Sequence, residues 1–306
     1  MPMSSHDKAG SRTPYRSANP VVRLASGPIE IELHPALGAR IGRLRYLGEA
    51  EPFDYLAPLE VANFNPSSWP KAGCFTMLPY TNKFHGNTLK WGNEVIRVAS
   101  PDAPAFLHGW GLRQAWSVVE ASSTHCTMAL CAAATDAWPW AYRSELRVSV
   151  DAAGMDLALA VFNESARPMP VGMGFHPYFS IDSGIEATVS ASARWQADAT
   201  SAGLPAVREA LDMPLRLSLQ NGALPEDTLT WFCETPRAEA VIRYPNSGRR
   251  ISLSCSEAQY LVVHYRAGER FLCLEPCTHQ AGGLDTLTHA ALPGQSVSLS
   301  MRLHLA

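Results

Sequence analysis

The chain has 306 residues, of which 46% are hydrophobic and 17% are charged, a balance that suits a globular protein with a sizeable core. Its formal net charge of −3 leaves no basic surplus that would attract nucleic acid or an anionic membrane. The sequence contains no run of about 18 apolar residues, which excludes a membrane-spanning helix.

Residues 1–20 are polar and lack the apolar core that a secretory signal needs. We expect them to form a disordered tail, and the protein to stay in the cytoplasm. No linker-like change of composition divides residues 21–306, so one domain is predicted there. Neither nucleic acid nor membrane is expected as a partner, and the sequence leaves both a monomer and a homodimer open.

Apolar residues alternate with polar ones along most of the chain, which is the period of a half-buried β-strand. Residues 29–33 form the first clear example and residues 297–305 the last. Three hairpins are predicted where two such runs flank a turn: 145–150 with 155–162, 241–244 with 250–254, and 260–265 with 271–274. A single helical turn is expected at residues 206–211. The pattern predicts an all-β sandwich or barrel of many antiparallel strands.

The cysteines indicate a protein without disulfides. There are seven, an odd number in a long chain, and most lie in apolar runs where a free thiol behaves as a small hydrophobic group. Cys273, Cys277 and His279 could suggest a metal site, but their spacing is wrong for structural zinc and no second pair exists. We therefore expect no metal.

His176 is the strongest candidate for chemistry, in the run Gly174-Phe175-His176-Pro177-Tyr178-Phe179. The glycine allows close backbone approach, and Pro177 biases His176 toward an extended conformation. An imidazole held beside aromatic rings suits a sugar, because the rings bind its C–H face while the imidazole reaches an oxygen. The alternative is a structural histidine buried on a strand.

Three other segments offer groups of a similar kind. His108 precedes a glycine and a tryptophan, and Asn82 with Lys83 supplies an amide and a cation. Glu275 ends an apolar run, and we expect Pro276 to end strand pairing there. Burial would raise the pKa of the Glu275 carboxyl, whereas a nearby imidazolium would lower it. Taken singly, each segment also has a structural interpretation as a turn or a solvated strand end.

The order of these segments resembles the aldose 1-epimerase (galactose mutarotase) family. The residues that carry the resemblance are Pro79-Tyr80-x-Asn82-Lys83, His108-Gly109, Gly174-Phe175-His176-Pro177-Tyr178-Phe179 and Leu274-Glu275-Pro276. It extends over about residues 21–306. It implies a large antiparallel β-sandwich, the galactose mutarotase-like supersandwich, with an open sugar-binding cleft on one sheet.

The resemblance also implies an activity and three catalytic positions. The protein would be an isomerase that interconverts the α and β anomers of an aldose without a cofactor. The position of His176 is that of the general acid and the position of Glu275 that of the general base. His108 would be a second histidine at the sugar ring. Opening the ring removes a proton from the anomeric hydroxyl and adds one to the ring oxygen, so we expect a protonated His176 and an ionised Glu275.

Four further residues are expected to bind the substrate. Asp227 resembles the family's aspartate for sugar hydroxyls, and Asn82 and Tyr178 complete the implied contacts. Lys83 departs from the pattern, because family members usually carry Arg after the Asn. Lysine is a point charge on a flexible stem and lacks the planar fork of arginine, so substrate choice is left open.

Three alternatives remain. A mutarotase of a sugar phosphate or an acidic sugar would use cations such as Lys83, Lys90 and Arg97, which otherwise read as a solvated face. A carbohydrate-binding protein without catalysis would not need the acid–base pair of His176 and Glu275. A glycosidase would need two carboxylates across the scissile bond, and only one is well framed here.

Overall fold

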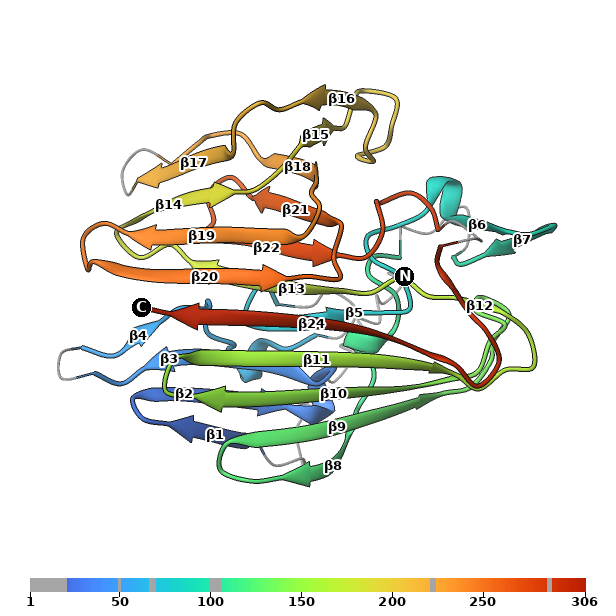
Figure 1. Cartoon of the computed structure of the whole chain (residues 1–306), viewed down its shortest axis with the longest axis horizontal. Helices are drawn as coiled ribbons and strands as arrows, with labels where there is room; N and C mark the ends of the chain where they lie inside the picture. The colour runs from blue at the N-terminus through green and yellow to red at the C-terminus, as the bar shows by residue number, and fades with distance from the viewer. Residues whose placement is uncertain (1–20, 49–50, 66–69, 100–105, 221–223, 285–287) are drawn as a thin grey trace, which may run out of the picture.

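The computed structural model describes residues 21–48, 51–65, 70–99, 106–220, 224–284 and 288–306. In this part of the chain the regular structure is nearly all β, in two large antiparallel sheets that lie one behind the other (Figure 1). The predicted all-β sandwich is confirmed. The predicted tail, residues 1–20, lies outside the described residues.

The first sheet has eleven strands. In spatial order they are β1 (Val22–Ser26), β2 (Ile29–His34), β3 (Arg40–Tyr46), β5 (Cys74–Met77), β13 (Gly174–Ser180), β22 (Phe271–Cys277), β21 (Tyr260–Tyr265), β18 (Leu229–Glu234), β15 (Ala193–Gln196) and β16 (Val207–Ala210), with β4 (Phe53–Asp54) paired to β3. The strands at its centre come from distant parts of the chain.

The second sheet has nine strands. In spatial order they are β17 (Leu215–Gln220), β14 (Gly184–Val189), β19 (Ala238–Tyr244), β20 (Arg249–Cys255), β24 (Ser296–Leu305), β11 (Gly154–Asn163), β10 (Tyr142–Asp151), β9 (His125–Ala132) and β8 (Ser117–Ala121).

Smaller elements complete the described chain. Two short pairs are β6 (Thr88–Trp91) with β7 (Glu94–Arg97), and β12 (Met169–Pro170) with β23 (Ala290–Ala291). The four helical elements are 3₁₀ turns: η1 (Pro35–Leu37), η2 (Val61–Asn63), η3 (His85–Asn87) and η4 (Gly111–Arg113). None of these helices is long and apolar enough to cross a membrane.

The three predicted hairpins are confirmed as β10 with β11, β19 with β20, and β21 with β22. The expected helical turn at residues 206–211 is wrong, since Val207–Ala210 forms the edge strand β16 and pairs with β15. Pairing with β15 gives the backbone groups of four residues hydrogen-bond partners along this sheet edge. A helical turn bounded by prolines would be too short to gain helical cooperativity.

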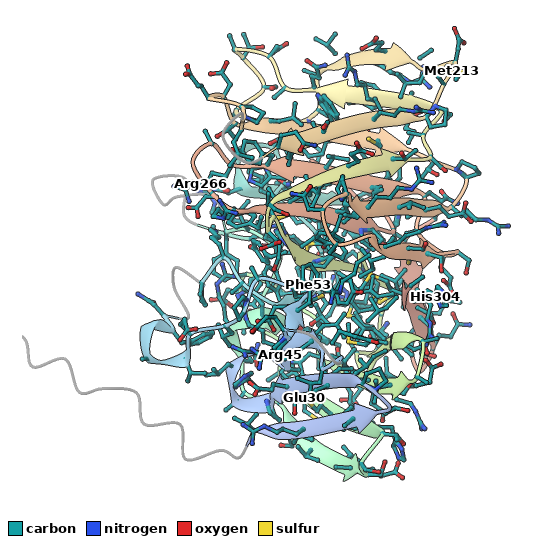
Figure 2. The ribbon with its side chains drawn as sticks, turned by 90° about the vertical axis from the view of Figure 1, so that its left-hand side faces the viewer. Glu30, Arg45, Phe53, Met213, Arg266 and His304 are labelled. Carbon is teal, nitrogen blue, oxygen red and sulfur yellow. The ribbon has the colours of Figure 1, made fainter. Side chains whose placement is uncertain are left out.

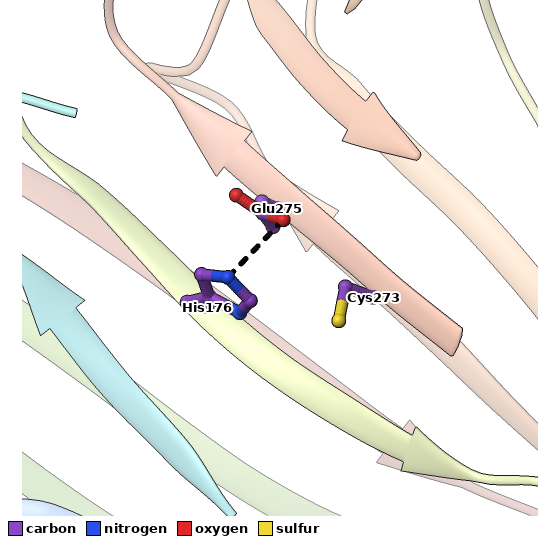
Figure 3. A group of neighbouring side chains, drawn as sticks. All are labelled: His176, Cys273 and Glu275. Atoms are coloured by element: carbon purple, nitrogen blue, oxygen red, sulfur yellow. Dashed lines mark ion pairs between the residues drawn. The ribbon is translucent and has the colours of Figure 1, made fainter. Parts of the chain in front are cut away.

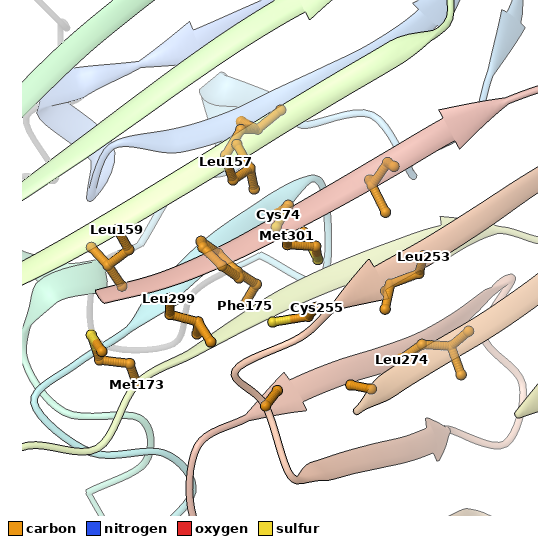
Figure 4. Close-up of a cluster of buried hydrophobic side chains, with 14 of the residues drawn as sticks. Cys74, Leu157, Leu159, Met173, Phe175, Leu253, Cys255, Leu274, Leu299 and Met301 are labelled. Carbon is orange, nitrogen blue, oxygen red and sulfur yellow. The ribbon is translucent and has the colours of Figure 1, made fainter. Parts of the chain in front are cut away.

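The main core lies between the two sheets. Figure 4 shows side chains from both sheets meeting there, among them Phe175 and Leu274 from the first and Leu157, Leu299 and Met301 from the second. Successive residues of a strand point to opposite faces. The neighbours of Phe175 and Leu274, which are His176 and Glu275, therefore point away from this core, to the outer face of the eleven-stranded sheet.

Two adjacent central strands each contain a proline, and the ladder between them is interrupted at that point. β13 and β22 pair Gly174 with Cys277 and Tyr178 with Cys273, and the pairing skips the residues between. Pro177 and Pro276 lie in that stretch and have no N–H to donate. The expectation that Pro276 ends strand pairing is wrong, because it pairs with Leu261 of β21 and β22 continues to Cys277.

Candidate active site

His176 and Glu275 face one another across β13 and β22. The register that pairs Gly174 with Cys277 and Tyr178 with Cys273 places them directly opposite. The Nε2 atom of His176 lies 3.3 Å from Oε1 of Glu275, and both residues are buried, 5% and 4% exposed (Figure 3). The two residues are thus held on rigid central strands, within reach of a shared proton.

The ring of His176 is held between two aromatic rings. Phe75 of β5 lies 4.6 Å from it between centroids, and Tyr178 stacks on it at 4.6 Å with an interplanar angle of 19°. Gly174 lets β13 approach this region closely, since a Cβ there would lie 2.8 Å from the Pro276 carbonyl oxygen. The predicted framing of His176 by glycine and aromatic residues is therefore what fixes its orientation.

His108 lies on a loop beside the same pair, with its ring centroid 5.1 Å from that of His176. The backbone N–H of Asn82 donates to Nδ1 of His108 at 3.2 Å, so a neutral His108 carries its proton on Nε2. The Asn82 carbonyl accepts from the His108 backbone N–H at 2.7 Å. Arg113 donates to the carbonyls of Leu107 and Gly109 on either side of His108. These bonds position the imidazole.

These side chains line one cavity of about 230 Å³. The described lining consists of Lys71, Asn82, Lys83, Leu107, His108, His176, Tyr178, Gly203, Thr230, Phe232, Val262, His264, Arg266, Phe271 and Glu275. The structure thus brings together six of the seven residues expected at the site. The seventh, Asp227, is exposed on the segment before β18 and does not line the cavity.

Burial controls the protonation of the pair. It raises the pKa of the Glu275 carboxyl to about 8, and the charge of Lys71 acts in the opposite direction with a smaller effect. Burial, followed by the charges of His108, His264, Lys71 and Arg40, lowers the pKa of His176 well below its usual range. At neutral pH the proton of the pair therefore rests on Glu275, the reverse of the expected state, because the low-polarity surroundings disfavour both charges.

His108 is also kept neutral. Burial lowers its pKa to about 3, and the cations of Arg113 and Lys71 add to the shift. A neutral imidazole with its proton on Nε2 is a hydrogen-bond donor and not an acid at physiological pH. His108 is thus suited to hold an oxygen atom of a ligand.

The residues expected to bind substrate have additional contacts. Asn82 adopts a left-handed backbone, with φ of 54°, and its Oδ1 accepts from the Lys83 N–H at 3.1 Å. Lys83 extends across the cavity and its Nζ donates to the carbonyl of Ala202. Asn82 therefore shapes the turn that positions His108, while Lys83 joins two sides of the cavity.

Sequence reasoning missed several lining residues, including Lys71, His264 and Arg266. Val262 and His264 lie on the same face of β21, and the register places them opposite Glu275 and Cys273. Only the position of β21 beside β22 shows that this outer face belongs to the site. Lys71 precedes β5 in a loop and carries no local signal.

One set of potential metal ligands is present among the described residues. His176, Cys273 and Glu275 each offer a ligand atom, and these atoms lie within 4.8 Å of one another (Figure 3). Burial raises the pKa of the Cys273 thiol well above its usual range, which disfavours the thiolate that a metal requires. Cys273, Cys277 and His279, the metal group considered from the sequence, do not form this set. The Nε2 atom of His279 instead accepts a hydrogen bond from the Thr81 N–H at 2.9 Å. Six of the seven cysteines are buried, and all are free.

Comparisons with known proteins support the family that the sequence motifs resemble. The sequence profile of the family described as Aldose 1-epimerase matches residues 34–300. The chain is 26% identical over 253 residues to the uncharacterized protein YphB of Escherichia coli (strain K12), covering 76% of this chain and 84% of YphB.

Two solved structures share the fold. A galactose mutarotase-like protein from Clostridium acetobutylicum superposes with a TM-score of 0.78 at 17% identity, covering 94% of this chain and 95% of that one. Galactose 1-epimerase from Lactobacillus acidophilus NCFM superposes with a TM-score of 0.75 at 15% identity, covering 94% of each. Since the profile matches most of its length, the chain belongs to the aldose 1-epimerase family.

Proposed function

We propose that this protein is a mutarotase, an isomerase that interconverts the α and β anomers of an aldose by opening and closing its ring. The observation that carries the proposal is the pair of His176 and Glu275, two buried titratable groups 3.3 Å apart on the wall of a cavity. Opening a cyclic hemiacetal requires one group that accepts a proton and another that donates one.

A pair that holds a single proton meets both needs. Glu275, as the carboxylate, removes the proton of the anomeric hydroxyl, while His176, as the imidazolium, supplies the ring oxygen. This form differs from the one that burial favours by the transfer of one proton between the two side chains. The 3.3 Å contact between Nε2 and Oε1 provides the path for that transfer.

Ring closure reverses these steps. Opening leaves the proton on Glu275 and an open-chain aldehyde in the cavity. Rotation about the C1–C2 bond presents the other face of the aldehyde, and His176 recovers its proton from the attacking hydroxyl as Glu275 returns the other. Electrons are not transferred, and the residues of the chain account for every proton. The Nε2–H of neutral His108 supports the oxygen on which charge develops.

The test is the rate of anomer exchange. Purified protein is added to freshly dissolved α-D-glucose, α-D-galactose and pentoses, followed by polarimetry, and to equilibrated sugars, followed by exchange NMR spectroscopy. We expect exchange faster than the buffer rate for at least one aldose, in proportion to protein concentration. Tight sugar binding without any acceleration across the panel would instead identify a binding protein and contradict the proposal.

A further inference from the structure

The cavity that holds His176 and Glu275 is surrounded by basic side chains. Lys71, Lys83, His264 and Arg266 line it, and Glu275 is the only carboxylate among its described lining residues. The described wall of the cavity therefore presents three long basic side chains, Lys71, Lys83 and Arg266, beside a single carboxyl group.

Three of these basic groups gather at one end of the cavity. His264 lies opposite Cys273, one side-chain row along the sheet from Glu275, and rows on one face of a strand are about 7 Å apart. Arg266 follows two residues later, at the end of β21, and Figure 2 labels it at the periphery of the molecule. Lys71 precedes β5. This cationic end is thus displaced from the catalytic pair by about the width of a sugar ring.

The charges at this end act on one another. Desolvation lowers the pKa of the Lys71 ammonium, and Arg266 is the next cause of the shift. Burial lowers the pKa of His264, and Lys71 and Arg266 lower it further. His264 is therefore neutral at neutral pH, and the repulsion at this end of the cavity is between Lys71 and Arg266. An anion bound between these two side chains removes their repulsion and gains an attractive contact with each.

Lys83 is placed differently from these three residues. Its Nζ donates to the Ala202 carbonyl on the far side of the cavity. Lys83 therefore adds positive charge to the cavity but is committed in part to holding the loop after β15. Arg266, by contrast, is exposed, and its planar guanidinium can bind a carboxylate or a phosphate through two parallel hydrogen bonds.

We propose that the substrate is an aldose with an anionic group, a carboxylate or a phosphate, on its exocyclic carbon, and that Arg266 and Lys71 bind this group. This inference rests on the proposed mutarotase function and specifies its substrate. His176 and Glu275 act at the anomeric centre, while the cationic end binds the opposite end of the sugar. Lys90 and Arg97, the other cations considered from the sequence, lie on the β6–β7 pair and do not line the cavity.

The experiment compares anomer exchange of glucose, glucuronate and glucose 6-phosphate by NMR spectroscopy, in the full-length protein and in two variants. Arg266→Gln removes the proposed anion ligand, and Arg97→Gln removes an exposed arginine outside the cavity as the matched control. If Arg266→Gln still prefers the anionic sugar because Lys71 alone binds its anionic group, the double variant with Lys71→Gln is measured as well. Glucuronate and glucose 6-phosphate separate a carboxylate from a phosphate as the preferred group.

We expect kcat/KM for one anionic sugar to exceed that for glucose by about tenfold to hundredfold, as one or two charge-assisted hydrogen bonds provide. Arg266→Gln, or its combination with Lys71→Gln, lowers kcat/KM for the anionic sugar by at least about tenfold more than kcat/KM for glucose, so most of the preference is lost. Arg97→Gln leaves the preference intact, and added salt weakens it in the unmodified protein.

Equal or faster exchange of glucose would overturn the substrate inference and leave the mutarotase proposal standing. A preference for anions that survives the double variant would overturn the assignment of Arg266 and Lys71. No acceleration of any of the three sugars, together with none in the neutral panel, would overturn both proposals.

Discussion

His176 and Glu275 face one another where the ladder between β13 and β22 is interrupted, and the two strands pair on either side of this gap. The Nε2 atom of His176 lies 3.3 Å from Oε1 of Glu275. Pro177 and Pro276 each follow one member of the pair. The two side chains are therefore fixed by central strands, while the backbone between them lacks two of its usual donors. The pair titrates as a unit, so its pH dependence belongs to both residues together.

The first prediction concerns the pH dependence of kcat/KM. Activity needs one proton on the pair, and the pair loses it as pH rises through about 8, where burial places the pKa of Glu275. It gains a second proton only well below the usual pKa of histidine, because burial lowers the pKa of His176. We expect a profile that is flat around neutrality and falls above a pH of about 8. A fall near 6.5, the ordinary value for histidine, would show that the pair is not desolvated.

The second prediction is that Glu275→Gln stabilises the fold at alkaline pH. In the wild-type chain this carboxyl ionises near 4.5 when unfolded and near 8 when folded, so the folded state binds more protons between those values. The free energy of unfolding therefore decreases as pH rises from about 4.5 to about 8, by an amount on the order of a few kcal/mol. The glutamine in the variant does not titrate, so this contribution to the pH dependence of the free energy of unfolding is absent there.

Urea unfolding at pH 5.5 and pH 8.5 measures this effect. The difference in unfolding free energy between Glu275→Gln and wild type should be larger at the higher pH. An equal difference at both values would mean that the folded protein solvates the carboxylate as water does.

The third prediction compares two glycines with similar backbone angles. Gly109 has φ of 66°, and a Cβ there would lie 2.1 Å from the Leu78 carbonyl oxygen, whereas Gly92 has φ of 58° and open space around it. Gly92→Ala should lose about 1–2 kcal/mol, the cost of a left-handed residue. Gly109→Ala should lose more and also reduce kcat, because its backbone must move next to His108. Equal losses of stability with normal kcat would show that the His108 loop tolerates displacement.

The fourth prediction concerns Asp227, which the family resemblance placed at the sugar. It is exposed and does not line the cavity. We expect Asp227→Asn to change kcat/KM by no more than about twofold, as for an ordinary surface substitution. A rise in KM of tenfold or more, measured by anomer exchange, would mean that the segment before β18 reaches the sugar when it binds.

Particular residues show what the sequence could predict. Period-two alternation and turn residues predicted the β10–β11 and β21–β22 hairpins, because these are local patterns. The helix expected at residues 206–211 was wrong because strand pairing at a sheet edge outweighed a local signal. The position of β13 beside β22 is not local, since nearly a hundred residues separate them, and only the family resemblance indicated that His176 and Glu275 meet.

Protonation was the least predictable property of the site. The sequence showed that burial and an imidazolium would shift the pKa of Glu275 in opposite directions, and it could not show which is stronger. The structure buries both partners, so His176 is neutral and burial decides the direction. Lys71, Arg266 and His264 were missed for a related reason: their importance comes from facing one cavity, which depends on sheet order.

The most direct test of the proposed mechanism is anomer exchange in His176→Asn and Glu275→Gln, each measured with the sugar that the wild-type protein exchanges fastest. A positioned acid or base contributes about 10²–10⁴-fold. The matched controls are His125→Asn and Glu120→Gln, because these residues form a pair of the same type, 3.2 Å apart, on β9 and the exposed edge strand β8, outside the cavity. We predict a loss of at least about 10²-fold in kcat for each site variant, with cooperative unfolding retained, and wild-type rates for both controls. Rates near wild type in either folded site variant would contradict the assignment of His176 and Glu275 as the acid–base pair.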